Sequence, residues 1–578
     1  MKESSPNDYI AGKVLRSHLL VTILVTLSAT LSIVLNSLIV GRYLGADALA
    51  VFGLSSPILI LSSAFAGIFG NGGTIICSRY LGSGDVRAIR NNFSVTMLAS
   101  ILVGLVFTVF VMVALGPITV ALGADASMQG TMESYIAGLA ASTIPFLIAQ
   151  NLLLYIRMDG SQRLALVAIV VTIVSDVAFA IWGVGTDMGM TAVGLAIGVS
   201  NLCGMAVCGM HFLKNGRRLG FARPYDFKTE ISSVVSAGIP TAINRGSQTL
   251  KNLALNNYLM IVVGSSAVVA LSVQTSVYQF TIAVCTGYGM MVAMMCGMFY
   301  GERDKTSMES TLRVSMRSGV MISTVVAIPL FIFAPDIVSM FIKDGGDPEE
   351  CILAVRLFMF SLPTSTVCLI LLYMHQTLGN MMLCNSISLT RGFIYVVLIS
   401  IVLYPLMGTN AVWISFVLAD ILSILTLMIA IRSKTGAFPR TLGDFIVTPA
   451  GFSDITEICT ISIHDDMDEV MGLTASIEEA CIRNGVDEIR AHKVALCIEE
   501  MAGNVVKFAF SDEGMHCMDI RILVQNGDLI FRLRDDGVAF NPLEDVTGDH
   551  LGIAVVKATA KSINYSNSIG LNNLTVVI

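Results

Sequence analysis

Long apolar stretches fill this 578-residue chain from about residue 17 to residue 432, and they constrain its fold more than any other feature. A bilayer core of about 30 Å requires roughly 20 apolar residues in a helix. Stretches of that length predict twelve spans, near residues 17–40, 50–75, 93–116, 133–156, 164–186, 190–213, 233–262, 267–298, 316–341, 352–376, 385–407 and 410–432. The expected fold is therefore a polytopic α-helical membrane protein.

Composition divides the chain into two parts with different solvents. Charged residues make up only 13% of the sequence, against about 25% in an average soluble protein, yet they reach ordinary density from about residue 453 onward. The formal charge of −7 provides no basic field, so nucleic-acid binding is not expected. The twelve cysteines are scattered without metal-ligand spacing, which predicts neither a disulfide framework nor a zinc site.

Lysine and arginine gather in one set of alternate loops. The set comprises Arg79, Arg87, Arg90, Arg157, Arg163, Lys214, Arg217, Arg218, Arg223, Lys228, Arg303, Lys305, Arg313, Arg317 and, near a membrane edge, Arg391. The positive-inside rule makes this side cytoplasmic. Twelve spans then place both termini in the cytoplasm.

The apolar region repeats itself. The segment GADALAV at 45–51 recurs as GSSAVVA at 264–270, and LGSGD at 81–85 recurs as YGERD at 300–304. Two six-helix halves explain this, and we predict them over residues 1–225 and 226–435, followed by a linker over 436–452. Because each half has an even number of spans, the halves insert in the same orientation and leave a cavity between them.

Three segments carry a family resemblance. They are NSLIVGRYLGADALA at 36–50, SRYLGSGD at 78–85 and TIVSD at 172–176. Together they resemble the motifs of MATE (multidrug and toxin extrusion) transporters, over roughly residues 10–435. The resemblance implies a secondary active antiporter in a bacterial inner membrane that exports small organic molecules in exchange for H+ or Na+.

Asp176 is the predicted coupling residue. It lies about twelve residues into the fifth span, which at about 1.5 Å per residue places it near the bilayer middle, where a carboxylate must bind a cation, take a proton or meet a partner. It also falls on the family's acidic position. The alternative is a structural aspartate bonded to a helix end or an amide. Asn36 stands where many relatives carry an acid in the first span, and its carbonyl can bind a cation but cannot titrate.

The seventh span carries polar residues where sodium-coupled relatives have an acid. At about 100° per residue, six of them fall on one helix face: Asn244, Arg245, Gln248, Lys251, Asn252 and Asn256. We expect this face to line the central cavity. Its two cations would attract a carboxylate or phosphate unless Asp176 or Asp420 neutralises them, so the substrate class stays open. A displaced helix boundary or a structural ion pair are the alternatives.

From about residue 453 the periodicity changes. An alternating segment predicts a strand, followed by helices near 466–484 and 488–509, strands near 516–524 and 528–535, a helix from Gly552 and two closing strands. The expected fold of residues 453–578 is an α/β sandwich in which helices cover a mixed sheet.

The motifs of this region resemble the GHKL (histidine-kinase-like) ATPase fold, and most closely the anti-sigma-factor serine kinases. Glu500 and Asn504 form Glu-x-x-x-Asn, a spacing that puts both side chains on one helix face. The resemblance implies that Asn504 holds Mg²⁺. Glu500 would orient or deprotonate the attacking hydroxyl or water.

The remaining motif residues are expected around the nucleotide ATP. By the resemblance, Asp535 accepts a hydrogen bond from the adenine amino group, and Gly537 lets the backbone approach the nucleotide. Gly548 and Gly552 would meet phosphate at a helix N-terminus. Thr575 would help to hold adenine.

The leading functional prediction is an antiporter with a regulatory or serine-kinase-like ATP-binding domain, whose partner would be an anti-anti-sigma-type protein. One alternative is a membrane sensor that controls the kinase-like domain. Another is a flippase for lipid-linked sugars, which the basic face of the seventh span favours. The sequence has no Walker loop, so transport powered in the manner of ABC proteins is not expected.

Overall fold

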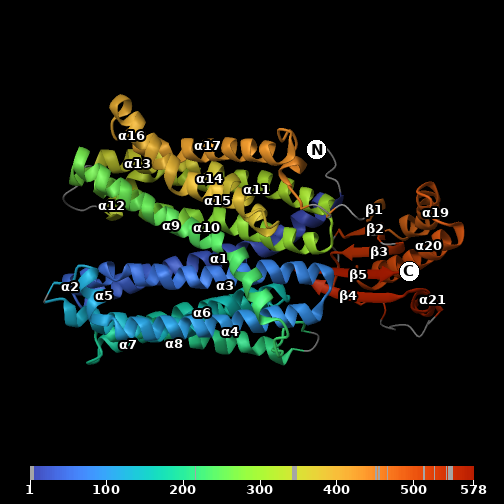
Figure 1. The fold of residues 1–578 in the computed structure, drawn as a ribbon, viewed down its shortest axis with the longest axis horizontal. Helices are drawn as coiled ribbons and strands as arrows, with labels where there is room; N and C mark the ends of the chain where they lie inside the picture. Colours follow the sequence, from blue (N-terminus) through green and yellow to red (C-terminus); the bar gives the residue numbers. More distant parts are fainter. Residues whose placement is uncertain are drawn as a thin grey trace.

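The computed structural model of the chain describes residues 6–578 except 126, 215–216, 342–347, 450–451, 453–455, 465, 512–514, 526, 542 and 544–550. A long helical bundle occupies the chain up to Thr435, and a five-stranded sheet with its own helices lies at one end of that bundle (Figure 1).

Among the described residues, the first half of the bundle contains eight α-helices. They are α1 (Pro6–Tyr43), α2 (Ala46–Leu54), α3 (Ser56–Ser83), α4 (Val86–Val113), α5 (Leu115–Ala121), α6 (Gln129–Met158), α7 (Gln162–Val184) and α8 (Met190–Gly209). Nine α-helices lie in the described part of the second half. They are α9 (Phe227–Val262), α10 (Ser265–Gly301), α11 (Lys305–Ile332), α12 (Ala334–Phe341), α13 (Pro348–Met359), α14 (Ser361–Thr377), α15 (Met381–Leu389), α16 (Tyr395–Met407) and α17 (Asn410–Thr435), with a π-helical turn between α15 and α16.

Within the described residues, ten helical segments are long and apolar enough to cross a bilayer, or eleven if α13 and α14, bent by 44°, form one span. Helix α9 has the length of a span, but its many polar residues keep it out of this group. The expectation of a polytopic helical membrane protein is met, whereas the count of twelve spans stays a prediction.

The helix caps repeat between the two halves. Asp85 accepts a hydrogen bond from the backbone N–H of Ala88 (2.9 Å) at the start of α4. Asp304 accepts one from the backbone N–H of Ser307 (2.9 Å) at the start of α11. Each bond satisfies an otherwise free donor of the first helical turn. The repeated aspartates of the sequence therefore have the same local role.

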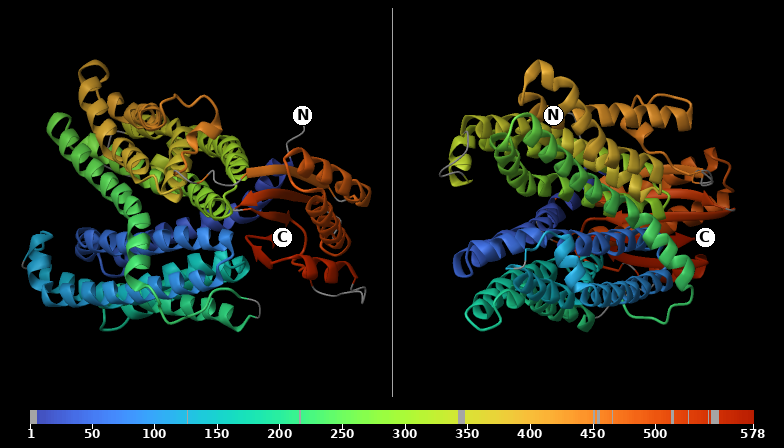
Figure 2. Two further views of the ribbon diagram at one scale, coloured as in Figure 1. Left: turned by 45° about the vertical axis from the view of Figure 1, so that its right-hand side comes forward. Right: turned by 60° about the vertical axis from the view of Figure 1, so that its left-hand side comes forward.

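The repeated glycines meet where α3 crosses α10. A Cβ on Gly82 would lie 1.9 Å from the carbonyl oxygen of Met298, and one on Gly301 would lie 2.0 Å from that of Arg79. Only glycine permits this approach. The two halves thus touch closely at the end of the bundle beside the sheet, and their helices diverge away from it (Figure 2).

The C-terminal sheet has the order β1 (Thr456–His464), β2 (Cys517–Gln525), β3 (Asp528–Asp535), β5 (Leu571–Val577), β4 (Ser562–Ser568), and every pair is antiparallel. The prediction of a mixed sheet is therefore wrong. Two residues separate β2 from β3, and two separate β4 from β5, whereas a parallel connection needs about a dozen residues or more.

The two faces of the sheet have different neighbours. Leu529, Phe531 and Leu533 of β3 are buried in a core shared with the helices α18 (Met467–Met471), α19 (Leu473–Arg483), α20 (Glu488–Phe508) and α21 (Leu551–Thr559). Side chains alternate along a strand, so Arg532 and Arg534 lie on the opposite face. That face is turned toward the bundle, and the sheet lies between the bundle and its own helices (Figures 1 and 2).

Two arginines counted among the cytoplasmic loop residues lie elsewhere. Arg157 is inside α6 and 5% exposed, and Arg391 is in the π-helical turn and 7% exposed. Arg391 forms an ion pair with Asp420 of α17, with 2.7 Å between Nε and Oδ1. Arg391 was misassigned because sequence alone does not reveal its buried partner, Asp420, and Arg157 because α6 continues to Met158, beyond the predicted span end at residue 156.

The predicted linker is packed against the bundle where it is described. Ile446 and Val447 are buried, and the Asn380 side chain donates a hydrogen bond of 2.5 Å to the Val447 carbonyl. A short 3-10 turn at Leu442–Phe445 carries the chain past α11. The sheet is thereby placed beside the second half of the bundle.

Candidate functional site

Asp176 is buried on α7 and faces α1. Its Oδ2 accepts hydrogen bonds from the Ser32 hydroxyl and from the Asn36 amide, the latter at 2.9 Å. The carboxyl is 1% exposed, and Ser200 of α8 also faces it. The structure thus brings together Asp176 and Asn36, as their predicted roles require.

Two oxygens of this group are left over. Asp176 Oδ1 and Asn36 Oδ1 are buried and accept no geometrically good hydrogen bond from the described residues. Carboxylate, amide and hydroxyl oxygens are ligands for a hard cation, and the carboxylate can also take a proton. Within the described part of the chain, no cluster of three or more His, Cys, Asp or Glu side chains could hold a metal ion, so a cation here would rely on these mixed oxygens.

Asp420 is already neutralised inside the second half. Besides its ion pair with Arg391, it accepts hydrogen bonds from the hydroxyls of Ser365 (2.6 Å) and Thr364 (3.0 Å). Arg391 also donates to Ser365 Oγ at 2.8 Å. From the sequence, Asp420 is a candidate counter-charge for the cations of the seventh span, but its ion-pair partner is Arg391.

The two cations of α9 separate instead of sharing one cavity lining. Lys251 is 6% exposed, and its Nζ lies 4.8 Å from the ring centre of Phe416 and 5.1 Å from that of Tyr278, inside the second half. Arg245 is exposed and faces α3, with Nη1 3.4 Å from Ser63 Oγ. The other members of the predicted face are partly buried or exposed: Asn244, Gln248, Asn252 and Asn256.

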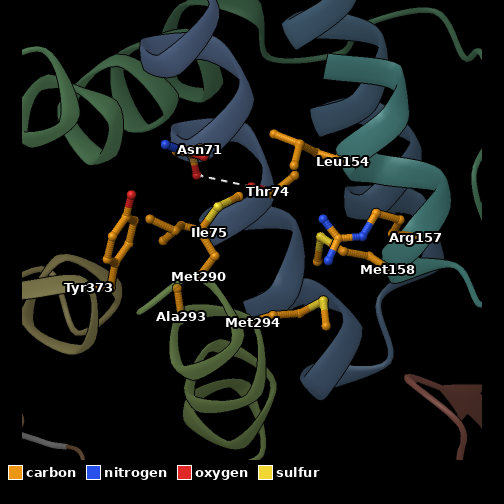
Figure 3. A pocket seen from close by; sticks show the side chains of 10 residues that line it. All are labelled: Asn71, Thr74, Ile75, Leu154, Arg157, Met158, Met290, Ala293, Met294 and Tyr373. Atoms are coloured by element: carbon orange, nitrogen blue, oxygen red, sulfur yellow. Dashed lines mark hydrogen bonds between the residues drawn. The ribbon is translucent and has the colours of Figure 1, made fainter. Parts of the chain in front are cut away.

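A pocket lies between the two halves (Figure 3). Its lining comes from α3, α6, α10 and α14 and comprises Asn71, Thr74, Ile75, Leu154, Arg157, Met158, Met290, Ala293, Met294 and Tyr373. Tyr373 and Arg157 lie on opposite sides of it. The pocket begins about one helical turn from the crossing of α3 and α10, because Ile75 precedes Arg79 and Met294 precedes Met298 by one turn.

The predicted nucleotide residues lie where the sheet meets α20. Asp535, the last residue of β3, is 2% exposed and accepts hydrogen bonds from Asn572 Nδ2 (2.7 Å) and the Gly537 backbone N–H (3.0 Å). Burial, partly offset by these bonds, raises the pKa of Asp535 to about 7. Glu500 and Asn504 are both on α20, where Glu500 is exposed.

Gly537 lies where the loop after β3 contacts the C-terminal end of α20. A Cβ at this position would lie 2.5 Å from the carbonyl oxygen of Ala509, and the neighbouring Val538 N–H donates to the same oxygen at 2.9 Å. The loop after β3 is therefore pressed against the end of α20. Gly552 is the second residue of α21, and Gly548 lies outside the described residues.

Thr575 is not brought to this site. It pairs with Arg532 in the β3–β5 ladder, whereas Asp535 pairs with Asn572. Because side chains alternate between faces, Thr575 lies on the face turned toward the bundle. Asn572 is the residue of β5 that reaches Asp535. Strand alternation read back from the chain end could have found it.

The described residues fit an adenine nucleotide and a divalent cation. A buried carboxylate at a strand end can accept a hydrogen bond from an amino group, and a glycine loop allows close backbone approach. Asn504 and Glu500 supply oxygen atoms on a neighbouring helix. Mg²⁺ bound there would neutralise phosphate charge.

The face of the sheet turned toward the bundle carries an arginine cluster that sequence reasoning missed. We call Arg521, Arg532 and Arg534 the arginine face. Arg534 forms an ion pair with Glu302, approaches Asp304 at 3.4 Å, and donates to Ser307 Oγ at 2.9 Å. Arg521 Nη1 lies 3.6 Å from Asp304 as well, and Arg532 donates to the Glu302 carbonyl.

Asp304 is fully enclosed by this contact. Although burial opposes its ionisation, Arg521 and Arg534 hold the pKa of its carboxyl below the ordinary value. The arginine face therefore binds the α10–α11 loop of the second half through charged, buried contacts.

The same sheet also contacts the first half. Arg218 donates to Ser568 Oγ (2.6 Å) and to the Asn567 carbonyl (3.2 Å) at the end of β4. Lys13 of α1 forms an ion pair with Asp536 at 2.6 Å. Asp536 directly follows Asp535. The domain thus bridges both halves at the end where α3 and α10 cross.

A two-half helical bundle with a buried carboxylate, joined to a domain with these nucleotide-site residues, defines a multi-pass membrane transporter with an ATPase-like domain. The MatE family profile matches residues 21–182 and 240–408, and that of the histidine kinase-like ATPase domain matches residues 463–578. The chain belongs to the MatE family and carries a C-terminal histidine-kinase-like ATPase domain, as the motifs predicted.

Two curated relatives are similar to the bundle. The probable multidrug resistance protein YoeA of Bacillus subtilis is 21% identical over 334 residues, covering 56% of this chain and 71% of the relative. The multidrug export protein MepA of Staphylococcus haemolyticus is 23% identical over 393 residues, covering 66% and 84%. These relatives favour the exporter over the sensor and flippase alternatives.

Solved structures share the fold. An outward-facing multidrug resistance MATE transporter of the MOP superfamily is 17% identical with a TM-score of 0.69, covering 76% of this chain and 100% of that one. A mutant of the Vibrio cholerae MATE transporter VcmN is 16% identical with a TM-score of 0.69, covering 74% and 99%. At this identity the likeness concerns the fold alone.

Proposed function

We propose that this protein is a secondary active exporter of small organic molecules whose nucleotide domain controls opening on the cytoplasmic side. The observation that carries the proposal is the contact of one sheet with both halves of the bundle. Alternating access requires the halves to separate at each end in turn, and a domain bound to both halves opposes their separation where it docks.

The proposed orientation follows from the positive-inside rule. Twelve spans, with α9 as the seventh, place both termini and the nucleotide domain in the cytoplasm of a bacterial inner membrane. Helix α9 tolerates its polar residues because Lys251 is enclosed by aromatic rings and Arg245 faces the other half of the bundle. The proposed boundaries between the two halves, the linker and the nucleotide domain lie near residues 225, 435 and 452.

Asp176 is the proposed site of coupling to H+ or Na+. Its carboxyl shares Oδ2 with two donors from α1, while Oδ1 and the Asn36 carbonyl are free to bind. Binding or release of a cation would alter the attraction between α7 and α1. Since α1 also packs on α10 and α11, such a change can reach the second half.

In the nucleotide domain, Asp535 and Gly537 would bind adenine, and Asn504 would hold Mg²⁺. Glu500 would act as base if phosphate is transferred to water or to a serine of an anti-anti-sigma-type partner. Gly548 and Gly552 would lie near the phosphates. We propose regulation as the main role, because Asp536, next to Asp535, binds Lys13 on α1.

Transport in inside-out vesicles tests the coupling proposal. Uptake of ethidium and of carboxyfluorescein is measured under imposed proton or sodium gradients. The Asp176→Asn variant should lose gradient-driven uptake, whereas Asp47→Asn, which changes an exposed acid of α2, should retain it. Undiminished uptake by Asp176→Asn would contradict the coupling role.

Nucleotide control is tested in the same vesicles with ATP and Mg²⁺ added outside, on the former cytoplasmic face. ATP should change the uptake rate in the unmutated protein but not in Asp535→Ala, which should no longer bind ATP. Lys13→Ala should still bind ATP while its uptake responds less. An unmutated protein that binds no ATP, or an uptake rate indifferent to ATP, would remove the regulatory proposal.

A further inference from the structure

Arg157 is a buried cation with no acidic partner in the described part of the chain. Its guanidinium donates to the Thr22 hydroxyl of α1, and the residue is 5% exposed. Among the residues that the structure describes, no carboxylate forms an ion pair with it. A buried charge is costly unless it is paired or solvated. A bound anion would therefore stabilise the Arg157 guanidinium.

The Arg157 side chain borders a pocket in which such an anion could bind. Arg157 lines the pocket between the halves, across from Tyr373 (Figure 3). Asn71 and Thr74 of α3 line it too. The Thr74 hydroxyl donates to the Gly70 carbonyl at 2.7 Å, whereas the Asn71 amide makes only a long contact of 3.4 Å with the Thr241 hydroxyl and can donate to a ligand. No acid is among the lining residues, all of which are described.

A second cation lies close to the same space. Arg245 is exposed on α9 and interacts electrostatically with Tyr373. Its side chain approaches Gly67, one helical turn before Asn71 on α3. Like Arg157, it makes no ion pair with any described acid. Arg157 thus lines the pocket itself, and Arg245 lies outside its lining, near Gly67 on α3.

The buried acids of the described bundle helices do not line the pocket, and one of them, Glu230, accepts hydrogen bonds from Tyr80 and Asn92. Asp420 is paired with Arg391, and Asp176 is held between α1 and α7. Neither lines the pocket. An organic cation entering it would meet positive charge that the described residues do not compensate.

We propose that the pocket between the halves binds an organic anion, with Arg157 as the main contact of its carboxylate, sulfonate or phosphate. The inference rests on the proposed function as an exporter and specifies its substrate class. Met290, Met294 and Leu154 give the pocket apolar walls, so the ligand has an apolar or aromatic body attached to the charged group. Arg245 attracts the same charge as the ligand enters.

A pair of probes with one ring system and opposite charge tests the proposal. Naphthalene-2-carboxylate and 2-naphthylmethylammonium are titrated against the purified full-length protein in detergent, and binding is followed by naphthyl fluorescence. The carboxylate should bind at least about tenfold more tightly than the ammonium ion, because one charge-assisted contact has about that effect or more.

Variants test whether Arg157 is responsible for the tighter binding of the carboxylate. Arg157→Gln should weaken carboxylate binding about tenfold to a hundredfold, whereas Arg157→Lys, which keeps the charge, should retain most of it. Arg163→Gln removes an exposed arginine at the start of α7 and should change nothing. Arg245→Gln should weaken binding less than Arg157→Gln, and thermal unfolding of each variant checks that it is folded.

The outcomes separate this inference from the exporter proposal. Tighter binding of the ammonium ion, no binding of the carboxylate, or unchanged carboxylate binding by folded Arg157→Gln would overturn the anion site. If Arg157→Gln does not fold, two other results test the anion site: whether the unmutated protein binds the carboxylate more tightly than the ammonium ion, and whether Arg245→Gln weakens carboxylate binding. Carboxylate binding without gradient-driven uptake of either dye would instead leave the site standing and remove the exporter.

Discussion

Three buried aspartates, Asp420, Asp535 and Asp176, differ in the groups that stabilise their carboxylates. Asp420 is paired with an arginine, and Asp535 is held by an asparagine and a backbone N–H. Among the described residues, Asp176 accepts well-formed hydrogen bonds from neutral donors on one oxygen only. A carboxylate that is incompletely satisfied is the one whose charge a ligand or proton can change. Asp176 is therefore the best placed of the three for coupling.

The pair Arg391 and Asp420 should be important for stability. Asp420→Asn leaves a buried arginine without its counter-charge, which typically costs about 3–5 kcal/mol. We expect a clearly lower thermal midpoint of the purified protein. The double variant Asp420→Asn with Arg391→Gln should recover part of the loss, and a single variant as stable as the unmutated protein would contradict a structural ion pair.

Nucleotide binding should depend on pH through Asp535. Its pKa of about 7 lies far above that of an unfolded aspartate, so the folded domain holds a proton between about pH 4 and pH 7 that the unfolded chain releases. This group's contribution to stability is complete below about pH 4 and is lost as pH rises toward 7. The ionised form, the stronger acceptor for adenine, predominates above pH 7.

We therefore expect the affinity of the full-length protein for a fluorescent ATP analogue to rise between pH 6 and pH 8. Asp535→Asn should bind weakly and without this pH dependence. Asp519→Asn is the matched control, because burial also raises the pKa of Asp519, to about 6, on the other face of the sheet. If Asp519→Asn abolished the pH dependence and Asp535→Asn did not, the assignment would be wrong.

At the scale of elements, the crossing of α3 and α10 depends on two glycines. Gly82→Ala or Gly301→Ala places a methyl group against a backbone carbonyl of the other half, and overpacking of this kind costs about 1–3 kcal/mol. Both variants should unfold at lower temperature. Gly246→Ala, in α9 with open space around it, should be neutral or stabilising by up to about 1 kcal/mol.

The elements also show what the sequence could predict. The length of the apolar stretches and the repeated Gly82 and Gly301 indicated a doubled helical bundle, because both can be read from the sequence without knowing which helices pack together. Hydropathy gave α9 less support, since burial of Lys251 depends on rings that come from α10 and α17. Strand alternation places Arg534 on a sheet face, but nothing local says that this face is buried against a bundle.

The candidate sites divide in the same way. Asp176 with Asn36, and Glu500 with Asn504, were found because a motif or a helix spacing defined them. The pairing of Asp420 with Arg391 was missed because it depends on how α17 packs against the π-helical turn. Alternation along β5 already places Asn572 and Thr575 on opposite faces, but only the β3–β5 register, which sequence does not fix, places Asn572 opposite Asp535.

At the scale of the molecule, the arginine face should hold the cytoplasmic end closed. Arg534→Gln removes a buried ion pair with Glu302 and should increase the population of the cytoplasm-open state about tenfold or more. The measurement is the labelling rate of a cysteine introduced at Thr74, in the pocket, by an impermeant thiol reagent added on the cytoplasmic side. Arg483→Gln, at an exposed position of α19, should not change that rate.

An unchanged labelling rate in Arg534→Gln would show that docking does not limit opening. A faster rate that is matched by Arg483→Gln would point to general loosening instead. The decisive comparison is therefore between two arginines of one domain, only one of which touches the bundle.

The segment between α17 and β1, which is packed where it is described, affects the strength of docking. About twenty residues separate Thr435 from Thr456, and a flexible chain of that length keeps its ends within roughly 25 Å on average. A released domain would stay at an effective concentration in the millimolar range. Contacts too weak to hold two separate proteins together would then suffice, and small energetic inputs could switch the domain between docked and free states.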